Sequence, residues 1–369
     1  MKYWVTKKLG EVCELSAGGD VPKDNFSEIK TDKYQIPIYA NGEKNEGFYG
    51  FTNKAKVTKP SITVSARGTI GYAVKRLEPF FPIVRLIVVT PIDYKELSLD
   101  YLDYALRKTD FKHSGSSIPQ LTVPMIKDYE IPLPPLPEQQ RIVALLDEAF
   151  TAIAKAKANA EQNLKNAKEL FESYLQGVFE NGNWETKTLN EISENLDSKR
   201  VPITKNVRNE GSIPYYGASG IVDYVADYLF DEDLLCVSED GANLLARTYP
   251  IAFSISGKTW VNNHAHVLRF KNMVSQKFVE LYLNSIKLND FVSGMAQPKL
   301  NQTMLNKIPI PFPSIKEQGK IVSNLDALSS ETQKLQNIYQ TKINDLEELK
   351  KSVLQKAFSG ELKTAKALL

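Results

Sequence analysis

The segment closest to a catalytic motif lies at residues 252–259. Its sequence, AFSISGKT, matches a relaxed phosphate-binding loop, with Ala252 where the first glycine of that motif normally stands. Such a loop binds phosphate when a helix follows it, because the helix N-terminus supplies amide groups and the positive end of the helix dipole. Residues 260–268 are instead β-like in composition. We therefore do not expect a nucleotide site here.

His264 and His266 are a second candidate, because two residues at i and i+2 on a strand share a face and could bind a metal together with further ligands. The remaining histidine, His113, lies in the other half of the chain, and the only cysteines are Cys13 and Cys236. No third histidine or suitable cysteine is therefore near. The pattern favours a structural role, or an exposed position at a binding surface, for these histidines over a zinc site.

Signatures of catalysis are otherwise missing from the sequence. It contains no Asn/Asp-Pro-Pro-Tyr/Phe tetrapeptide of amino-methyltransferases and no Gly-x-Gly-x-x-Gly dinucleotide loop. Helicase and nuclease motifs are also absent, and the many acidic residues form no recognisable constellation. We predict no catalytic residues, no metal ligands and no cofactor of its own, so the chain is not expected to be an enzyme.

Length and composition bound the class of protein. At roughly 100–200 residues per domain, 369 residues suggest two or three domains. A content of 42% hydrophobic and 24% charged residues excludes a disordered chain. No apolar run could cross a membrane and no signal peptide is visible, so we expect a soluble, cytoplasmic protein. The net charge of +2 argues weakly against a dedicated nucleic-acid binder.

The chain carries a long internal repeat, the feature to seek first because it decides the architecture. At an offset of 179 residues, 119–121 (PQL) match 298–300 (PKL), and 131–134 (IPLP) match 310–313 (IPFP). Upstream the offset changes: residues 65–69 (SARGT) correspond to residues 238–242 (SEDGA) at an offset of 173 residues. Changing offsets indicate insertions in surface loops. The pattern predicts two copies of one scaffold with different binding surfaces.

Each copy begins with a mixed segment, at residues 1–137 and 183–313. Short β-rich runs bounded by Gly and Pro predict strands. They lie at 61–64 and 83–89 in the first copy, and at 234–237 and 266–270 in the second. One helix is expected near the end of each segment, at about 98–108 and 275–288. The fold class predicted for both segments is α+β.

Each copy ends in a long helix, at residues 138–182 and 314–369. Pro137, followed by Glu138 and Gln139, is a favourable helix start, because proline is tolerated at the first position and an acidic residue suits the first turn. At the matching place in the second copy, residues 314–317 (SIKE) form a capping box. Apolar residues then follow the 4-3 spacing of a coiled-coil seam. In the first helix these are Ile142, Leu146, Ala149, Ile153, Ala156, Ala160, Ala167, Leu170 and Tyr174. In the second they are Ile321, Leu325, Leu328, Leu335, Leu346, Leu349 and Val353, with Thr332, Tyr339 and Lys342 interrupting.

The two seams are each incomplete, which favours pairing between the helices. A chain with two pseudo-twofold-related copies requires that pairing to be antiparallel, with the α+β domains separated by the coiled coil. The alternative is that each helix packs only on its own domain.

These junctions resemble a known family. Residues 133–143 (LPPLPEQQRIV) and 310–322 (IPFPSIKEQGKIV) look like the segments before each long helix in the specificity subunit of Type I restriction–modification systems. Residues 348–362 (ELKKSVLQKAFSGEL), 216–220 (YGASG) and 240–244 (DGANL) are also similar to that family. The resemblance covers essentially the whole chain, in family order.

The resemblance implies a non-catalytic DNA-specificity subunit that serves host defence by DNA methylation and restriction. Each α+β unit would be a target recognition domain for one half of a split, asymmetric DNA sequence. The helices would set the spacer and dock two methyltransferase (modification) subunits. Motor–nuclease restriction subunits join some complexes. S-adenosylmethionine, ATP and magnesium would be needed only by the partner subunits.

Residues that touch DNA should be polar or basic and lie on exposed loops. In the first domain the candidates are Lys23, Tyr39, Asn41, Lys44, Arg67, Gly68, Thr69, Ser116 and Gln120. In the second they are Lys199, Arg200, Tyr216, Ser219, Asp240, Gly241, Asn243, Arg247, His264, Gln297 and Lys299. Lysines 23 and 199 and Arg200 are expected at phosphates, and Arg67 at a guanine. The alternative is that these loops are merely turns.

Two other functions stay open. One is a coiled-coil adaptor that binds protein, and the other is a specificity subunit of a related enzyme without a motor.

The distribution of net charge refines the DNA hypothesis, because the four segments in chain order carry +3, −2, −1 and +2. Neither domain is strongly basic, so the chain alone should bind DNA weakly and with a shallow salt dependence. The partner subunits would then supply much of the grip on phosphate.

Overall fold

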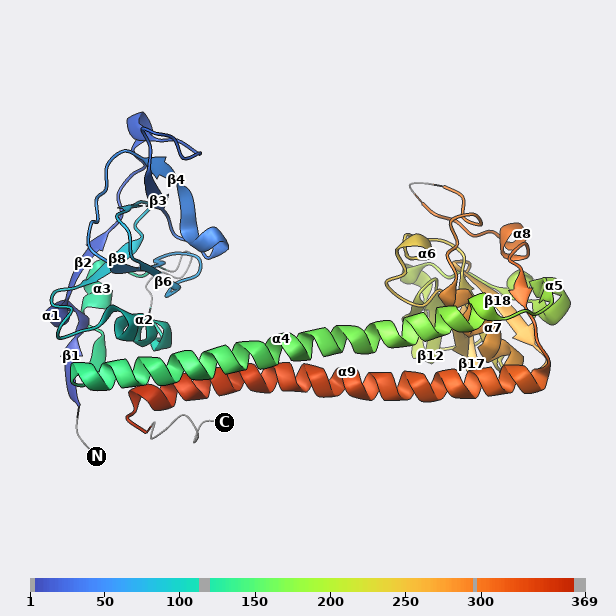
Figure 1. The fold of residues 1–369 in the computed structure, drawn as a ribbon. Helices are drawn as coiled ribbons and strands as arrows, with labels where there is room; N and C mark the ends of the chain where they lie inside the picture. The colour runs from blue at the N-terminus through green and yellow to red at the C-terminus, as the bar shows by residue number, and fades with distance from the viewer. Residues whose placement is uncertain (1–3, 113–119, 295–296, 362–369) are drawn as a thin grey trace. The chain divides into compact units, whose positions relative to one another are not determined.

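The computed structural model describes residues 4–112, 120–294 and 297–361 (Figure 1). The chain forms two compact units, one of residues 1–160 with 341–369 and one of residues 161–340. Both divisions fall inside long helices. Each unit therefore consists of one α+β segment and a piece of each long helix.

The first unit is built on a four-stranded antiparallel sheet in the order β2-β8-β5-β6. Its strands are β2 (Cys13–Ala17), β5 (Ser61–Val64), β6 (Ala73–Arg76) and β8 (Ile87–Pro91). A smaller sheet, β4-β3-β7, contains β3 (Ile36–Tyr39), β4 (Phe48–Thr52) and β7 (Phe81–Pro82), and β1 (Val5–Lys8) pairs with β9 (Glu130–Leu133). The helices are α1 (Leu9–Val12), α2 (Leu99–Lys108) and α3 (Val123–Lys127), with 3-10 turns η1 (Lys23–Asn25) and η2 (Lys44–Gly47).

The core of this unit is closed by the long helices. Strands β5 and β8 are buried along their whole length, and α2 lies between their sheet and the start of α4 (Figure 1). Ser98 caps α2 by accepting a hydrogen bond from the Tyr101 amide. Ile142 and Leu146 from α4, together with Val353 from α9, are almost fully buried in the same apolar cluster.

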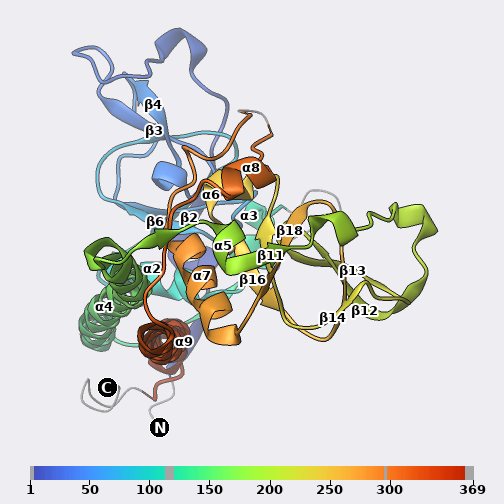
Figure 2. The ribbon, with the colours of Figure 1, turned by 90° about the vertical axis from the view of Figure 1, so that its right-hand side faces the viewer.

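The second unit repeats this plan. Its main sheet has the order β11-β18-β15-β16, and its smaller sheet has the order β13-β12-β17-β14. The strands are β10 (Thr186–Lys187), β11 (Ser193–Asn195), β12 (Glu210–Gly217), β13 (Gly220–Val225), β14 (Phe230–Asp231), β15 (Leu234–Ser238), β16 (Ala252–Ile255), β17 (Lys258–Val261), β18 (Ala265–Phe270) and β19 (Ile310–Pro311). The helical elements are α5 (Leu189–Ile192), η3 (Asp197–Lys199), η4 (Lys205–Val207), α6 (Asn243–Ala246), α7 (Met273–Ser285) and α8 (Gln302–Leu305). Figure 2 shows the smaller sheet set apart from α7.

Pairing patterns confirm that the two halves are copies of one fold. In both, the first strand pairs antiparallel with the strand before the long helix, β1 with β9 and β10 with β19. In both, the smaller sheet contains one parallel pair, β3 with β7 and β12 with β17. The predicted α+β class is therefore confirmed.

One predicted strand begins later than its composition suggests. The run 83–89 was expected to be extended throughout, but β8 starts at Ile87. Val84 and Arg85 have φ values of 51° and 59°, a left-handed conformation that breaks the strand before Leu86. Its apolar composition gave no sign of this turn.

The long helices are α4 (Leu136–Asn181) and α9 (Ile315–Phe358). In the first unit they run antiparallel, because the start of α4 packs on the end of α9 and Lys157 pairs with Glu347. In the second unit Phe179, near the end of α4, packs in one cluster with Ile321 near the start of α9. Each unit thus contains an antiparallel helix pair, and the pair also packs on its domain. Within the described residues, no helix is long and apolar enough to cross a membrane.

The buried stripe of these helices departs from the predicted heptads. Leu170, Tyr174 and Leu335 were assigned to the seams but are 50%, 45% and 38% exposed. Phe171 and Leu175 replace the first two, since the stripe runs through 164, 167, 171 and 175. That spacing covers 11 residues in three turns, close to the 3.6 residues per turn of a straight helix.

Thr332 was expected to interrupt the seam but is buried, with only 2% of its surface exposed. Its hydroxyl donates to the Leu328 carbonyl at 2.9 Å, one turn earlier in the same helix. A threonine can be buried at little cost when its hydroxyl is bonded in this way.

A buried glutamine at the start of each long helix accounts for the repeated sequence of the junction that precedes it. Gln139 and Gln318 are 0% and 1% exposed, and each side-chain amide donates to the carbonyl of a proline five residues earlier, Pro134 or Pro313. Gln139 also accepts from the Ser98 amide at the start of α2, and Gln318 accepts from the Ser275 hydroxyl in α7. The junction therefore ties each long helix to the helix of its own domain.

Candidate nucleic-acid interface

Three candidate residues of the first unit meet at the end of β5. The Asn41 side chain accepts a hydrogen bond from the Ala66 amide at 2.7 Å and donates to the Val84 carbonyl. The Arg67 guanidinium donates to Gln120 Oε1 from Nε at 3.3 Å and from Nη2 at 2.8 Å. Asn41 thus shapes the loop, while Gln120 orients Arg67.

The tip of this loop faces open space. Gly68 has a φ of +71°, and a Cβ placed there would meet no atom within 4 Å. Gly68 and Thr69 are exposed, and Arg67 is half-buried. The loop is therefore anchored at its base through Ala66 and open at Gly68, which suits contact with a large ligand.

The other candidates of this unit are more scattered. Lys23 and Lys44 are exposed on η1 and η2. The ring of Tyr39 is covered by the Arg76 guanidinium, 3.6 Å from its centroid, so its face is already occupied. Ser116 lies outside the described residues.

In the second unit, two candidates form internal contacts of their loop. The Asn243 side chain exchanges hydrogen bonds of 2.9 Å with the backbone of Tyr249, in both directions. Arg247 donates to the carbonyls of Leu283 and Ile286 at the end of α7. These contacts give both side chains a structural role, which the sequence did not predict.

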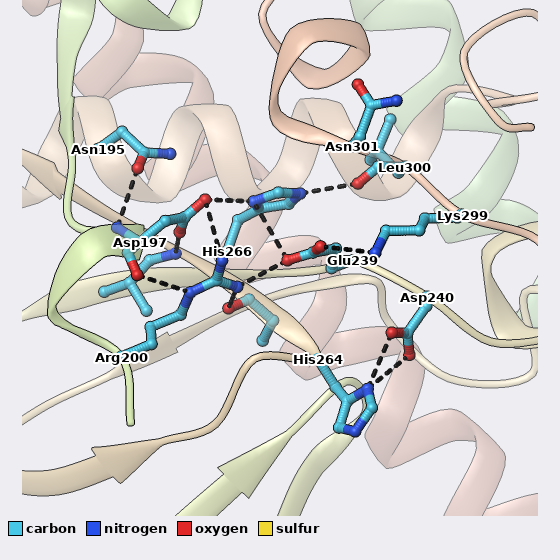
Figure 3. A network of polar contacts seen from close by, with 12 residues as sticks. Asn195, Asp197, Arg200, Glu239, Asp240, His264, His266, Lys299, Leu300 and Asn301 are labelled. Carbon is cyan, nitrogen blue, oxygen red and sulfur yellow. Dashed lines mark hydrogen bonds and ion pairs between the residues drawn. The ribbon is translucent and has the colours of Figure 1, made fainter. Parts of the chain in front are cut away.

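A buried ionic network underlies the remaining candidates of this unit (Figure 3). Arg200, predicted at a phosphate, has a side chain only 12% exposed. It donates to Glu239 Oε2 at 2.7 Å and to the Ala265 carbonyl at 2.6 Å, and lies 3.4 Å from Asp197 Oδ2. Burial removes Arg200 from the surface, so we withdraw its assignment to DNA phosphate.

His266 completes the network and is 1% exposed. Its Nδ1 lies 2.6 Å from Asp197 Oδ2, and its Nε2 lies 2.7 Å from the Leu300 carbonyl. Both neighbours are hydrogen-bond acceptors, so the ring links the Asp197 carboxylate to the Leu300 backbone through its two nitrogens.

The two carboxylates of the network are held in their charged form. Burial alone would raise the pKa of Asp197, but the His266 hydrogen bond and charge bring it below the usual value. Burial likewise opposes ionisation of Glu239, and Arg200 and His266 bring its pKa below the usual value. The network pairs these anions with Arg200, His266 and, at its rim, Lys299, whose Nζ lies 3.2 Å from Glu239.

Asp197, Glu239 and His266 also have the composition of a metal site, with ligand atoms within 4.8 Å of one another. Arg200, however, already bonds to Glu239 and approaches Asp197. A guanidinium thus supplies the positive charge that a cation would bring.

Sequence reasoning singled out His266 but not its partners. Asp197 and Glu239 lie 69 and 27 positions away in the chain. They meet His266 only because η3, the end of β15 and the start of β18 come together in the sheet. No local pattern could have revealed this.

Candidates on exposed turns surround the network. Lys199 follows Asp197 on η3, and Gln297 precedes the buried Pro298. Ser219 is exposed in the turn between β12 and β13, while Tyr216 is half-buried and stacks on Phe253 with ring centroids 5.9 Å apart.

The phosphate-loop-like segment has a different structure from the motif it resembles. Residues 252–255 and 258–261 form strands β16 and β17, and Gly257 between them has a φ of +67°. In this described part of the chain a strand therefore takes the place of the helix that phosphate binding requires.

Comparison with known proteins shows which family has this fold. The model of the type I restriction modification DNA specificity domain family matches residues 1–165 and again 181–347. The chain belongs to this family. The two matches coincide with the two copies of the fold, so this chain carries the specificity domain twice.

Individual relatives carry names that agree with the family match. A Haemophilus influenzae protein named as a type I restriction enzyme specificity subunit is 36% identical over 160 residues, 43% of this chain and 41% of the relative. A Mycoplasma pneumoniae protein named as a type I specificity subunit is 36% identical over 184 residues, 50% of this chain and 52% of the relative. The chain spans about half the length of these relatives.

A solved structure has the same fold over nearly the whole chain. It comes from a study of complex assembly and conformational transition in the type I R-M system, and superposes with a TM-score of 0.76. The match covers 98% of this chain and 99% of the other at 18% identity. At that identity the likeness shows the fold alone.

Proposed function

We propose that this chain is the DNA sequence-specificity subunit of a Type I restriction–modification complex. Residues 1–137 and 183–313 act as target recognition domains, and each reads one half of a split target. The observation that carries the proposal is the double match to the specificity-domain family, on two copies whose loops differ in chemistry.

The half-sites should differ in sequence. The loop after β5 presents Arg67, and the corresponding loop after β15 presents Asp240. Arginine and aspartate favour different base edges, so two identical half-sites would not suit both domains. The target is therefore asymmetric.

The long helices act as spacer and docking site. Their exposed faces would receive two methyltransferase subunits, and motor–nuclease subunits would join where restriction occurs. S-adenosylmethionine, ATP and magnesium would bind to those partners, and the complex would act in the cytoplasm. The chain itself contributes recognition and performs no chemical step.

Co-expression with a cognate methyltransferase subunit, followed by sequencing of the methylated genome, tests this proposal. We expect a split motif that is methylated only when this chain is present. A stable complex with the methyltransferase but no methylation and no DNA shift would support the protein-binding adaptor instead. Methylation without a split motif would contradict two-domain recognition.

A further inference from the structure

The ends of β5 and β15 offer a like-for-like comparison of the two units. The Leu121 amide donates to the Ala66 carbonyl at 2.9 Å, and the Leu300 amide donates to the Glu239 carbonyl at 2.7 Å. The next residue is Arg67 in the first unit and Asp240 in the second. One loop position therefore presents a cationic donor in one unit and an anionic acceptor in the other.

Both loops turn outward directly after this position. Gly241 has a φ of +107°, as Gly68 has one of +71°, and a Cβ at either would meet no atom within 4 Å. In each loop the side chain before the glycine is fixed by a neighbour. Gln120 holds Arg67, and His264 holds Asp240 through Nδ1, at 2.8 and 3.0 Å from its two carboxylate oxygens (Figure 3).

The base of the second loop is unusually well anchored. Glu239, next to Asp240, forms ion pairs with Arg200 and with Lys299. The Gly241 amide donates to the Pro298 carbonyl at 3.0 Å. The backbone on both sides of Asp240 is therefore fixed, while its carboxylate remains about one-third exposed.

A carboxylate at a DNA surface has few favourable partners. Phosphates repel it, and it can accept hydrogen bonds only from donors on base edges. In the major groove those donors are the exocyclic amino groups of cytosine (N4) and adenine (N6).

We propose that Asp240 is a specificity-determining residue that accepts a hydrogen bond from an exocyclic amino group of cytosine or adenine in one half-site. It occupies the loop position at which the first unit presents Arg67, whose fork suits guanine. His264 is a positioning residue that fixes the carboxylate. This inference rests on the proposed function and assigns a base chemistry to one loop.

The test uses the complete complex with its methyltransferase subunits. Asp240→Asn keeps the side-chain shape but replaces one acceptor oxygen by a donor. We expect the methylated motif to lose discrimination by about tenfold at one position of one half-site, with the other half-site unchanged. Asp231→Asn, the same substitution at an exposed residue of β14, is the matched control and should leave the motif intact.

A second measurement works with the unmodified protein and identifies the base. Methylation rates are compared on duplexes in which adenine is replaced by purine, or cytosine by pyrimidin-2-one, one position at a time. Each analogue lacks only the exocyclic amino group. A loss of about tenfold at one position identifies adenine or cytosine, and the Asp240→Asn complex should be insensitive to that replacement.

The outcomes separate this inference from the proposed function. If the unmodified complex yields no split motif, the proposed function fails. If it yields one, but Asp240→Asn leaves every position unchanged, or no amino group in that half-site matters, Asp240 is only the structural partner of His264 and the inference is overturned.

Discussion

The buried network of the second unit makes a sharp prediction about stability. His266→Leu introduces an apolar side chain of similar bulk and removes both ring nitrogens. Asp197 then loses the ring nitrogen that lies 2.6 Å from its carboxylate, and the Leu300 carbonyl loses its partner. His264→Leu is the matched control, because this histidine lies two residues away with a side chain 52% exposed.

The expected magnitudes differ several-fold. Removing one partner of a buried ion pair costs about 3–5 kcal/mol, because the other charge stays buried without compensation. Removing an exposed partner costs about 0–1 kcal/mol. With a urea m-value of about 2 kcal/mol/M, His266→Leu should lower the unfolding midpoint by roughly 1.5–2.5 M, and His264→Leu by less than about 0.5 M.

Tryptophan fluorescence can follow this unit selectively. The chain has three tryptophans, Trp4 in the first unit and Trp184 and Trp260 in the second. In a Trp4→Phe background the signal comes from the second unit alone. Equal destabilisation by the two histidine substitutions would refute the role of His266 as the buried partner of Asp197 and Leu300.

Further predictions concern both units. Arg67→Ala should change methylation at one half-site only, and an unchanged methylome would contradict its contact with DNA. Leu146→Ala should destabilise the first unit by about 2–5 kcal/mol in urea unfolding, because Leu146 is fully buried, whereas Lys157→Ala should cost less than about 1 kcal/mol. The lowered pKa values of Asp197 and Glu239 stabilise the folded state above their unfolded pKa values, near 3.8 and 4.5. That contribution disappears as the pH falls through the lower folded values, so the urea midpoint of the second unit should drop as the pH is lowered below about 5, and a flat profile would contradict it.

The sequence predicted the architecture well because its signals are repeated or periodic. The two copies, the α+β class and the long helices all follow from patterns that span many residues. The heptad assignment was wrong at Leu170, Tyr174 and Leu335, because a 3.5-residue stripe drifts around a straight helix. The left-handed turn at Val84 was missed because apolar composition carries no information on φ.

The candidate site was predictable only in outline. Loop composition pointed to the ends of β5 and β15, since turns with Gly, Asn and charged residues are visible locally. It could not distinguish Arg67, which is oriented by one neighbour, from Arg200 and Arg247, whose guanidinium groups form hydrogen bonds inside the protein. That difference depends on residues brought close by strand pairing.

The first unit has a consequence for synthesis on the ribosome. Its core needs Val353 and Phe358 from the end of α9 as well as the N-terminal segment, whereas the second unit is one continuous stretch of chain. The second unit can therefore fold first, although it is made later than most of the first. At about 5–20 residues per second, residues 1–160 wait roughly 10–40 s for the helix that completes them. A chain that stops short of Val353 would have a finished second unit and an open core in its first.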